Sequence, residues 1–288
     1  MANGRLLAAR LGLTITAASA LALAACGGEA EEPLRVGMIP DAGATQVSID
    51  EKAALRDYLA EKLGRPVELI IPTNYNAAVE AIGNGSLDIA YFGGLTYVKA
   101  HQLYGAIPLV QRDIDLQFHS LFITRPGSGI RGLGDLRGKT FCFGDVNSTS
   151  GHLMPQQNLR SAGLNPKEDL AEIRYTGSHP ATAEAVLAGA CDAGSLDETV
   201  FRTLGEEGKI PSGGLQVFHT SQPFADYVWA ARKDLPEADR DAFVKAFLDL
   251  RAGQDDAVLE VLRGEKYVPA RNESYDDVTE TARSLDLL

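Results

Sequence analysis

The segment FGDVNSTSGH, residues 143–152, combines the residue types that bind small anions. A helix beginning at Thr149 would leave its first backbone N–H groups unpaired, at the positive end of the helix dipole. Asn147 or Ser148 would cap this helix, Gly151 would let a ligand approach the first turn, and three hydroxyls add hydrogen-bonding groups. An ordinary Ser/Thr cap uses the same residue types. The segment lacks the patterns of a G-x-x-x-x-G-K-[ST] phosphate loop and of a G-x-S-x-G nucleophile elbow.

A second helix start of the same kind occurs in TGSHPATAEAV, residues 176–186. Ser178 suits the cap and Pro180 suits the first helical turn. His179 would then lie at the rim of the helix start, where its ring could donate a hydrogen bond to an anion.

A third helix start lies nearer the N-terminus, in PTNYNAAVEA, with Asn74 or Thr73 as the cap and Tyr75 on the first turn. All three helix starts follow predicted strands, and ligands of open α/β sheets bind at the carboxyl ends of strands. Together they favour an anion site over three unrelated caps. Thr96 or Tyr97, just after a Gly-Gly break, could line the wall of the same site.

These segments belong to a chain in which short apolar strands alternate with amphipathic helical patterns, which indicates βαβ units and a mostly parallel sheet. The first predicted strands and helices are strands at 34–40, 66–72 and 87–93 and helices at 48–64 and 74–85. A second βα series begins near residue 118, and strand-like segments near 118–124 and 226–232 would carry the chain between two α/β lobes. We expect lobe 1 at 34–120 plus 229–288 and lobe 2 at 121–228, with a ligand cleft between them.

The first 25 residues have the features of an export signal: Arg5 and Arg10 precede the apolar run LGLTITAASALALAA. The end of this run, Leu-Ala-Ala-Cys, resembles the bacterial lipobox, in which the cysteine is lipidated and becomes the new N-terminus. We therefore predict a lipoprotein signal peptide at 1–25 and a lipidated Cys26 with a flexible acidic tether at 26–33. Plain signal-peptidase cleavage and an uncleaved anchor are the alternatives.

Charge and cysteine usage restrict the partners. Removing residues 1–25 takes away two arginines and no acid, so the formal net charge changes from −12 to −14. A chain this acidic is a poor candidate for binding nucleic acid, and it must hold an anion by local donors. Cys142 and Cys191 match no zinc spacing. In an exported protein a disulfide between them is the natural hypothesis, with two separately buried thiols as the alternative.

The motifs LGDLRGKTFCFGDVNSTSGHLMP, YTGSHPATAEAVLAGACDAG and DIAYFGG, together with the lipobox, resemble the phosphonate/phosphite/phosphate-binding proteins of ABC transporters. The similarity covers roughly residues 34–270 and is most specific at 143–155. The resemblance implies a type II periplasmic-binding-protein fold with two crossover strands, whose lobes close on the ligand.

The resemblance also implies a set of binding residues. Side chains that match the family positions are Tyr75, Ser148, Thr149, His179 and Asp226, and backbone N–H groups would come from Ser150 and Gly151. One position departs from the family: Phe118 aligns where phosphonate-binding members place a pocket tyrosine. Asp197 and Glu198 fall near an acidic family position, with an ambiguous offset.

A pocket carboxylate at Asp226 would select among anions. It repels an anion unless the ligand has a proton or an amine to donate. Phosphite, phosphate and phosphonate monoanions carry a P–OH group, whereas sulfate near neutral pH does not, so Asp226 would favour phosphorus oxyanions or aminoalkylphosphonates. The alternative is that Asp226 only caps a turn in PFADY.

The sequence therefore predicts a binding protein that captures a small phosphorus oxyanion and delivers it to an ABC permease and its ATPase. It would be an exported cell-envelope lipoprotein that faces the periplasm or lies on the outer face of the cytoplasmic membrane, with no cofactor, metal ion or nucleic acid. A hydrolase would need Ser148 or Ser150 as nucleophile, His179 as base and Asp226 as orienter, but these serines stand outside a nucleophile motif. The remaining alternative is a sensor subunit that reports the same anion to a receptor kinase.

Overall fold

The computed structural model describes residue 1 and residues 32–41 and 50–288. The predicted signal segment and Cys26 lie outside the described residues, as do residues 48–49 of the first predicted helix. Residues 32–288 form one compact unit. Within the described residues, no helix combines the length and the apolar character needed to cross a membrane.

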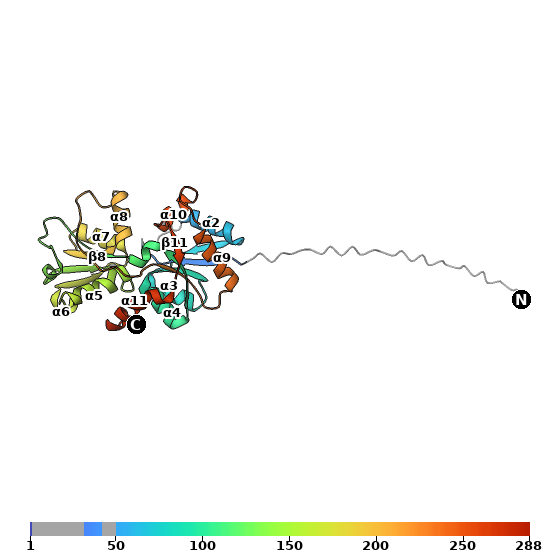
Figure 1. The fold of residues 1–288 in the computed structure, drawn as a ribbon, viewed down its shortest axis with the longest axis horizontal. Helices are drawn as coiled ribbons and strands as arrows, with labels where there is room; N and C mark the ends of the chain where they lie inside the picture. Colours follow the sequence, from blue (N-terminus) through green and yellow to red (C-terminus); the bar gives the residue numbers. More distant parts are fainter. Residues whose placement is uncertain (2–31, 42–49) are drawn as a thin grey trace. The chain divides into compact units, whose positions relative to one another are not determined.

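The unit is built on two sheets, each covered by helices (Figure 1). The first sheet has the strand order β11-β4-β10-β3-β1-β2. Its strands are β1 (Leu34–Met38), β2 (Val67–Ile70), β3 (Ile89–Phe92), β4 (Ile107–Arg112), β10 (Val228–Ala231) and β11 (Tyr267–Pro269). β1 pairs in parallel with β2 and β3, while β10 runs antiparallel to its neighbours β3 and β4.

The helices of the first lobe explain why the central strands β3 and β10 are apolar throughout. They are α2 (Ala53–Leu63), α3 (Tyr75–Gly83), α4 (Gly94–Tyr104), α9 (Glu237–Leu248), α10 (Asp256–Leu262), α11 (Asp276–Ser284) and the 3-10 turn η4 (Asn272–Tyr275). Every residue of β3 and β10 is buried, as expected for strands with both faces covered. Trp229 of β10 is fully buried and packs against Phe243 and Phe247 of α9.

The second sheet has the order β7-β6-β8-β5-β9. Its strands are β5 (Ser120–Thr124), β6 (Thr140–Phe143), β7 (Glu172–Tyr175), β8 (Ala193–Asp197) and β9 (Gln216–Thr220). The helical segments of this lobe are η2 (Leu133–Leu136), η3 (Thr149–Leu153), α5 (Met154–Ser161), α6 (Pro166–Asp169), α7 (His179–Leu187) and α8 (Glu198–Glu206). β6 pairs in parallel with β7 and β8, which places the ends of these strands, and the segments that follow them, at one edge.

Two crossover segments join the sheets, one between β4 and β5 with the 3-10 turn η1 (Asp113–Gln117), and one between β9 and β10. They pair with each other: Phe118 N donates to Phe224 O at 2.9 Å and Phe224 N donates to Phe118 O at 3.0 Å. The predicted alternation of strands and helices thus yields the two-lobed fold that the sequence indicated.

Cys142 of β6 and Cys191, just before β8, form a disulfide with their Cα atoms 5.9 Å apart. Both residues are buried in the core of the second lobe. Cys142 lies two residues before Gly144, so the bond fixes the strand that leads into the 143–152 segment.

The disulfide should stabilise residues 32–288 strongly. It closes a loop with a sequence separation of 49 residues, for which chain entropy corresponds to about 4 kcal/mol. We expect a reducing agent to lower the urea midpoint of the wild type, and to leave unchanged that of a Cys142→Ala/Cys191→Ala variant. Equal midpoints for the oxidised and reduced wild type would contradict this prediction.

Candidate functional site

The 143–152 segment forms a π-helical turn instead of the predicted regular helix start. Ser148 is the cap, its Oγ accepting a hydrogen bond from Gly151 N at 2.9 Å. Leu153 N donates to Ser148 O, five residues back, and α5 begins only at Met154. Pro155 gives the physical reason: it has no N–H to donate to Gly151 O, so a regular helix cannot run through this point. Gly151 O instead accepts from Gly144 N and from Ser195 Oγ.

His179 packs directly on this turn. A Cβ at Gly151 would lie 3.1 Å from His179 Cε1 and 2.9 Å from Ser148 Oγ, so only glycine fits without displacing its neighbours. The imidazole is buried, and its Nδ1 accepts from Asp197 N at 3.3 Å. Burial lowers the pKa of His179. The ring is therefore neutral near pH 7 and carries its proton on Nε2, which faces the hydroxyl of Tyr227 at 3.5 Å.

Tyr75 enters the site from the first lobe. Asn74 caps α3 by accepting from Ala77 N at 2.9 Å, which fixes Tyr75 as the first helical residue. The side chain is buried, and its hydroxyl has no hydrogen-bond partner among the described residues. Burial raises the pKa of Tyr75, and the nearby charges of Asp41, Asp145, Asp226 and Asp197 raise it further. Tyr75 is thus a neutral donor among carboxylates.

The start of α4, at the Gly-Gly break of the DIAYFGG motif, holds Asp226 and Thr149. Gly94 N donates to Asp226 Oδ1 at 2.9 Å, and Leu95 N donates to Thr149 Oγ1 at 3.0 Å. A Cβ at Gly93 would lie 3.2 Å from Thr149 Oγ1 and 3.3 Å from Asp226 Oδ1. The Gly-Gly pair therefore lets groups from the crossover and from the second lobe approach this helix end closely.

Two buried carboxylates of the site differ in their electrostatics. Burial raises the pKa of Asp226 to about 7, although hydrogen bonds from Gly94 and Thr149 work against the shift. Burial also disfavours the ionised form of Asp197, but His179 and the guanidinium groups of Arg263 and Arg112 hold the pKa of Asp197 below its usual value. Because His179 is itself neutral, we attribute this compensation mainly to the two arginines.

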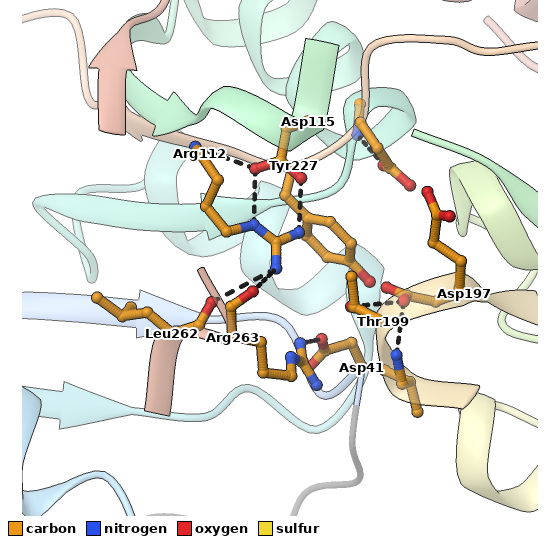
Figure 2. A network of polar contacts seen from close by, with 12 residues as sticks. Asp41, Arg112, Asp115, Asp197, Thr199, Tyr227, Leu262 and Arg263 are labelled. Carbon is orange, nitrogen blue, oxygen red and sulfur yellow. Dashed lines mark hydrogen bonds and ion pairs between the residues drawn. The ribbon is translucent and has the colours of Figure 1, made fainter. Parts of the chain in front are cut away.

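Figure 2 shows how these arginines reach the site. Arg263 pairs with Asp41, whose backbone oxygen accepts from His179 N at 3.2 Å. Arg112 pairs with Asp115 and donates to the backbone oxygen of Arg263 at 3.0 Å. Tyr227 lies beside Arg112, with the guanidinium carbon of Arg112 5.1 Å from the centre of its ring.

Three buried polar atoms of the site lack a hydrogen-bond partner among the described residues. They are the hydroxyl of Tyr75, Asp197 Oδ2 and Asp226 Oδ2. Unpaired buried polar groups are costly and usually mark a place where water or a ligand completes the hydrogen bonds. A separate cavity of about 660 Å³ is lined by residues of both lobes, among them Pro180 and Arg263, but by none of these three residues.

The structure brings most of the predicted residues together and leaves two outside. Tyr75, Ser148, Thr149, Ser150, Gly151, His179 and Asp226 are all buried on the elements just described. Tyr97 instead donates its hydroxyl to Asn272 Oδ1 at 3.0 Å and packs on Tyr275. Phe118 packs edge-on against Tyr227 at the crossover. Sequence reasoning missed Tyr227, whose only signal was its place directly after Asp226.

Two lobes joined by two crossovers, with unpaired polar groups buried between them, define a solute-binding protein of the type II periplasmic class. A family model described as "ABC transporter, phosphonate, periplasmic substrate-binding protein" matches residues 36–275. The chain belongs to this family, as the sequence motifs indicated, and is therefore an exported substrate-binding component of an ABC transporter.

Individual relatives are similar over nearly the full length. The chain is 32% identical over 268 residues to the probable ABC transporter phosphite binding protein PhnD1 of Prochlorococcus marinus (strain MIT 9301), covering 88% of this chain and 90% of that protein. It is 31% identical over 302 residues to the phosphate-import protein PhnD of Mycolicibacterium smegmatis (strain ATCC 700084 / mc(2)155), covering 92% of each. The solved structure of the Prochlorococcus PhnD1 in complex with methylphosphonate superposes with a TM-score of 0.83 at 31% identity, covering 88% of this chain and 98% of that one.

The raised pKa of Asp226 predicts a pH-dependent stability. Ionising this carboxyl in the folded state is unfavourable, so the stability that its protonated form contributes is lost as the pH rises from about 4 to about 7. The total loss is at most about 4 kcal/mol. We expect urea unfolding of the wild type to show this loss relative to Asp226→Asn, which cannot ionise. Parallel pH profiles for the two proteins would contradict the assignment.

Proposed function

We propose that the chain captures a singly protonated phosphorus oxyanion, namely a phosphonate, phosphite or phosphate, between its two lobes and delivers it to its permease. The observation that carries the proposal is the convergence of three unpaired buried groups, the Tyr75 hydroxyl, Asp197 Oδ2 and Asp226 Oδ2, beside neutral His179 and the turn at Ser148. A ligand that both donates and accepts hydrogen bonds would complete all of them.

The donors of the site suit the phosphoryl oxygens of the ligand, and the carboxylates suit its P–OH group. The Tyr75 hydroxyl, the Nε2–H of His179 and the backbone N–H groups at the start of η3 would donate to phosphoryl oxygens. Asp197, held ionised, would accept from a P–OH group. Asp226 would accept from the same kind of group when ionised. Sulfate has no proton to donate near pH 7 and would leave a buried carboxylate facing an anion, so the site would reject it.

The names of the relatives support this ligand class without selecting a member of it. One relative is named for phosphite, another for phosphate, and the solved structure contains methylphosphonate. These ligands share a phosphorus atom with three oxygens and differ in the fourth substituent. We propose that the donors and acceptors named above bind the PO₃ group that these ligands share.

We propose that the site binds without catalysis. The contacts of the three side chains that a hydrolase would need do not form a relay: Ser148 Oγ accepts from Gly151 N, His179 Nδ1 accepts from Asp197 N, and Asp226 contacts Gly94 and Thr149. A nucleophilic serine would need its proton taken by the histidine.

We also propose that the protein is anchored by a lipid on Cys26, the cysteine of the Leu-Ala-Ala-Cys sequence. A lipid would keep the binding protein close to its permease. We expect the full-length chain, expressed in a bacterium fed a labelled fatty acid, to incorporate the label and to fractionate with membranes. A Cys26→Ser variant should do neither, and labelling of that variant would place the lipid elsewhere.

The ligand prediction is tested by calorimetric titration of ligand-stripped residues 32–288 with phosphite, phosphate, methylphosphonate, 2-aminoethylphosphonate and sulfate. We expect 1:1 binding of at least one phosphorus ligand and none of sulfate. A Ser148→Ala/Thr149→Ala variant should lose at least about 100-fold in affinity, because it removes the hydroxyl that caps the η3 turn and the hydroxyl that contacts Leu95 N and Asp226.

The matched control is Ser128→Ala, which removes the hydroxyl that accepts from Ile130 N in another turn of the second lobe. It should bind as the wild type does. Binding of sulfate as tightly as the phosphorus ligands would overturn the selectivity argument, and an unaffected double variant would overturn the site.

A further inference from the structure

A second set of polar contacts joins the two lobes away from the unpaired atoms of the site. Lys99 of α4, in the first lobe, donates from Nζ to Asn147 Oδ1 in the second lobe at 2.7 Å. Asn147 is buried and Lys99 is half-buried, so the contact is shielded from solvent. None of the contacts described for the anion site uses either side chain.

Asp145 reinforces this contact. Its Oδ1 accepts from Asn147 N at 2.7 Å, which fixes the asparagine, and its carboxylate also accepts from the backbone N–H of Tyr75 in the first lobe. The positive charge of Lys99 lies close enough to favour the ionised form of Asp145, against the effect of burial. Two first-lobe helices, α3 and α4, are thus both held by one short segment of the second lobe.

The same segment continues into the anion turn. Ser148 N donates to Asp145 O at 2.9 Å, so the residues that contact the first lobe and the residues that would contact the anion form one rigid turn. Separating the lobes would break the hydrogen bond between Lys99 and Asn147 and expose both groups. The contact therefore stabilises the closed arrangement specifically.

We propose that Lys99 and Asn147, braced by Asp145, form a latch that holds the lobes closed without touching the ligand. This inference rests on the proposed function, because it assigns the latch to the closure that traps the anion. The apparent affinity of a ligand depends on the fraction of protein in the closed form. Loss of the latch must then lower the apparent affinity for every ligand by the same factor and speed the release of each.

The test compares Lys99→Met, Asn147→Ala and the double variant in residues 32–288, which form one compact unit. We expect each single variant to raise the dissociation constant of every phosphorus ligand bound by the wild type by the same factor. That factor is roughly five- to twentyfold. The release rate in stopped flow should rise in parallel. The double variant should be no weaker than the worse single variant, since both remove one contact.

The matched control is Lys245→Met, which removes a first-lobe lysine of α9 whose exposed ion pair is with Asp249, the residue that caps the end of the same helix. Its affinities and release rates should equal those of the wild type. A change in the ratio of affinities between ligands in the latch variants would mean direct ligand contact, and would overturn the proposal. A lower melting temperature with unchanged affinity and release would mean a merely structural contact, and would overturn it as well.

A measurement without ligand separates this proposal from the proposed function. Spin labels at Glu61→Cys on α2 and Arg202→Cys on α8, both exposed, report the distance between the lobes. The latch predicts a larger population of long distances in Lys99→Met than in the wild type, with or without ligand. If the wild type binds no phosphorus ligand, the proposed function fails, while these distances still decide the latch. Identical distance distributions in the two proteins would overturn it.

Discussion

The buried ion pair between Arg112 and Asp115 is the interaction on which the rest of the site depends. Both side chains are fully buried, and the guanidinium donates to the carboxylate from Nε at 2.8 Å and from a terminal nitrogen at 2.5 Å. Removing one partner of such a pair leaves an uncompensated charge and is strongly destabilising. The pair lies where β4 gives way to the first crossover, so it fixes the geometry between the lobes.

Several parts of the site are attached to this pair. Asp115 O accepts from Asp226 N at 3.0 Å, which positions the crossover carboxylate. Arg112 donates to the backbone oxygens of Leu262 and Arg263 and so holds the C-terminal segment against the hinge. Gly264 is needed there, because a Cβ would lie 2.5 Å from Arg112 Cδ. Arg263, held at a φ of 51°, can then direct its guanidinium to Asp41.

Sequence reasoning could predict those parts of the fold and site that depend on local signals. The strands and helices follow from periodicity, and the caps at Asn74, Ser148 and Ser178 follow from side chains that accept from the backbone N–H three residues ahead. The π-helical turn also had a local signal, Pro155, whose effect depends on the donors around Gly151 O. That consequence is tertiary and could not be read from the chain alone.

The parts that could not be predicted come from residues distant in sequence. Arg263 meets Asp41 across 222 positions, and Gly94 meets Asp226 across 132. Tyr97 was predicted to line the site because it follows the Gly-Gly break. Its side chain instead contacts Asn272 and Tyr275, which are distant in sequence, and these contacts decide the direction in which it points. Phe118 lacks the hydroxyl of the family tyrosine, but Tyr227 packs against Phe118 and places a hydroxyl near His179. This replacement also depends on residues distant in sequence.

The position of β10 has a consequence for the order in which the protein matures. This strand lies in the interior of the first sheet, between β4 and β3, yet it is made only after the entire second sheet. All five strands of the second sheet come from one uninterrupted stretch of chain, so that lobe can fold as soon as it emerges on the far side of the membrane. The first sheet cannot be completed until β10 has emerged, because β10 lies between β3 and β4 and pairs with both. During export its apolar strand edges are therefore the surface most exposed to aggregation and to proteases.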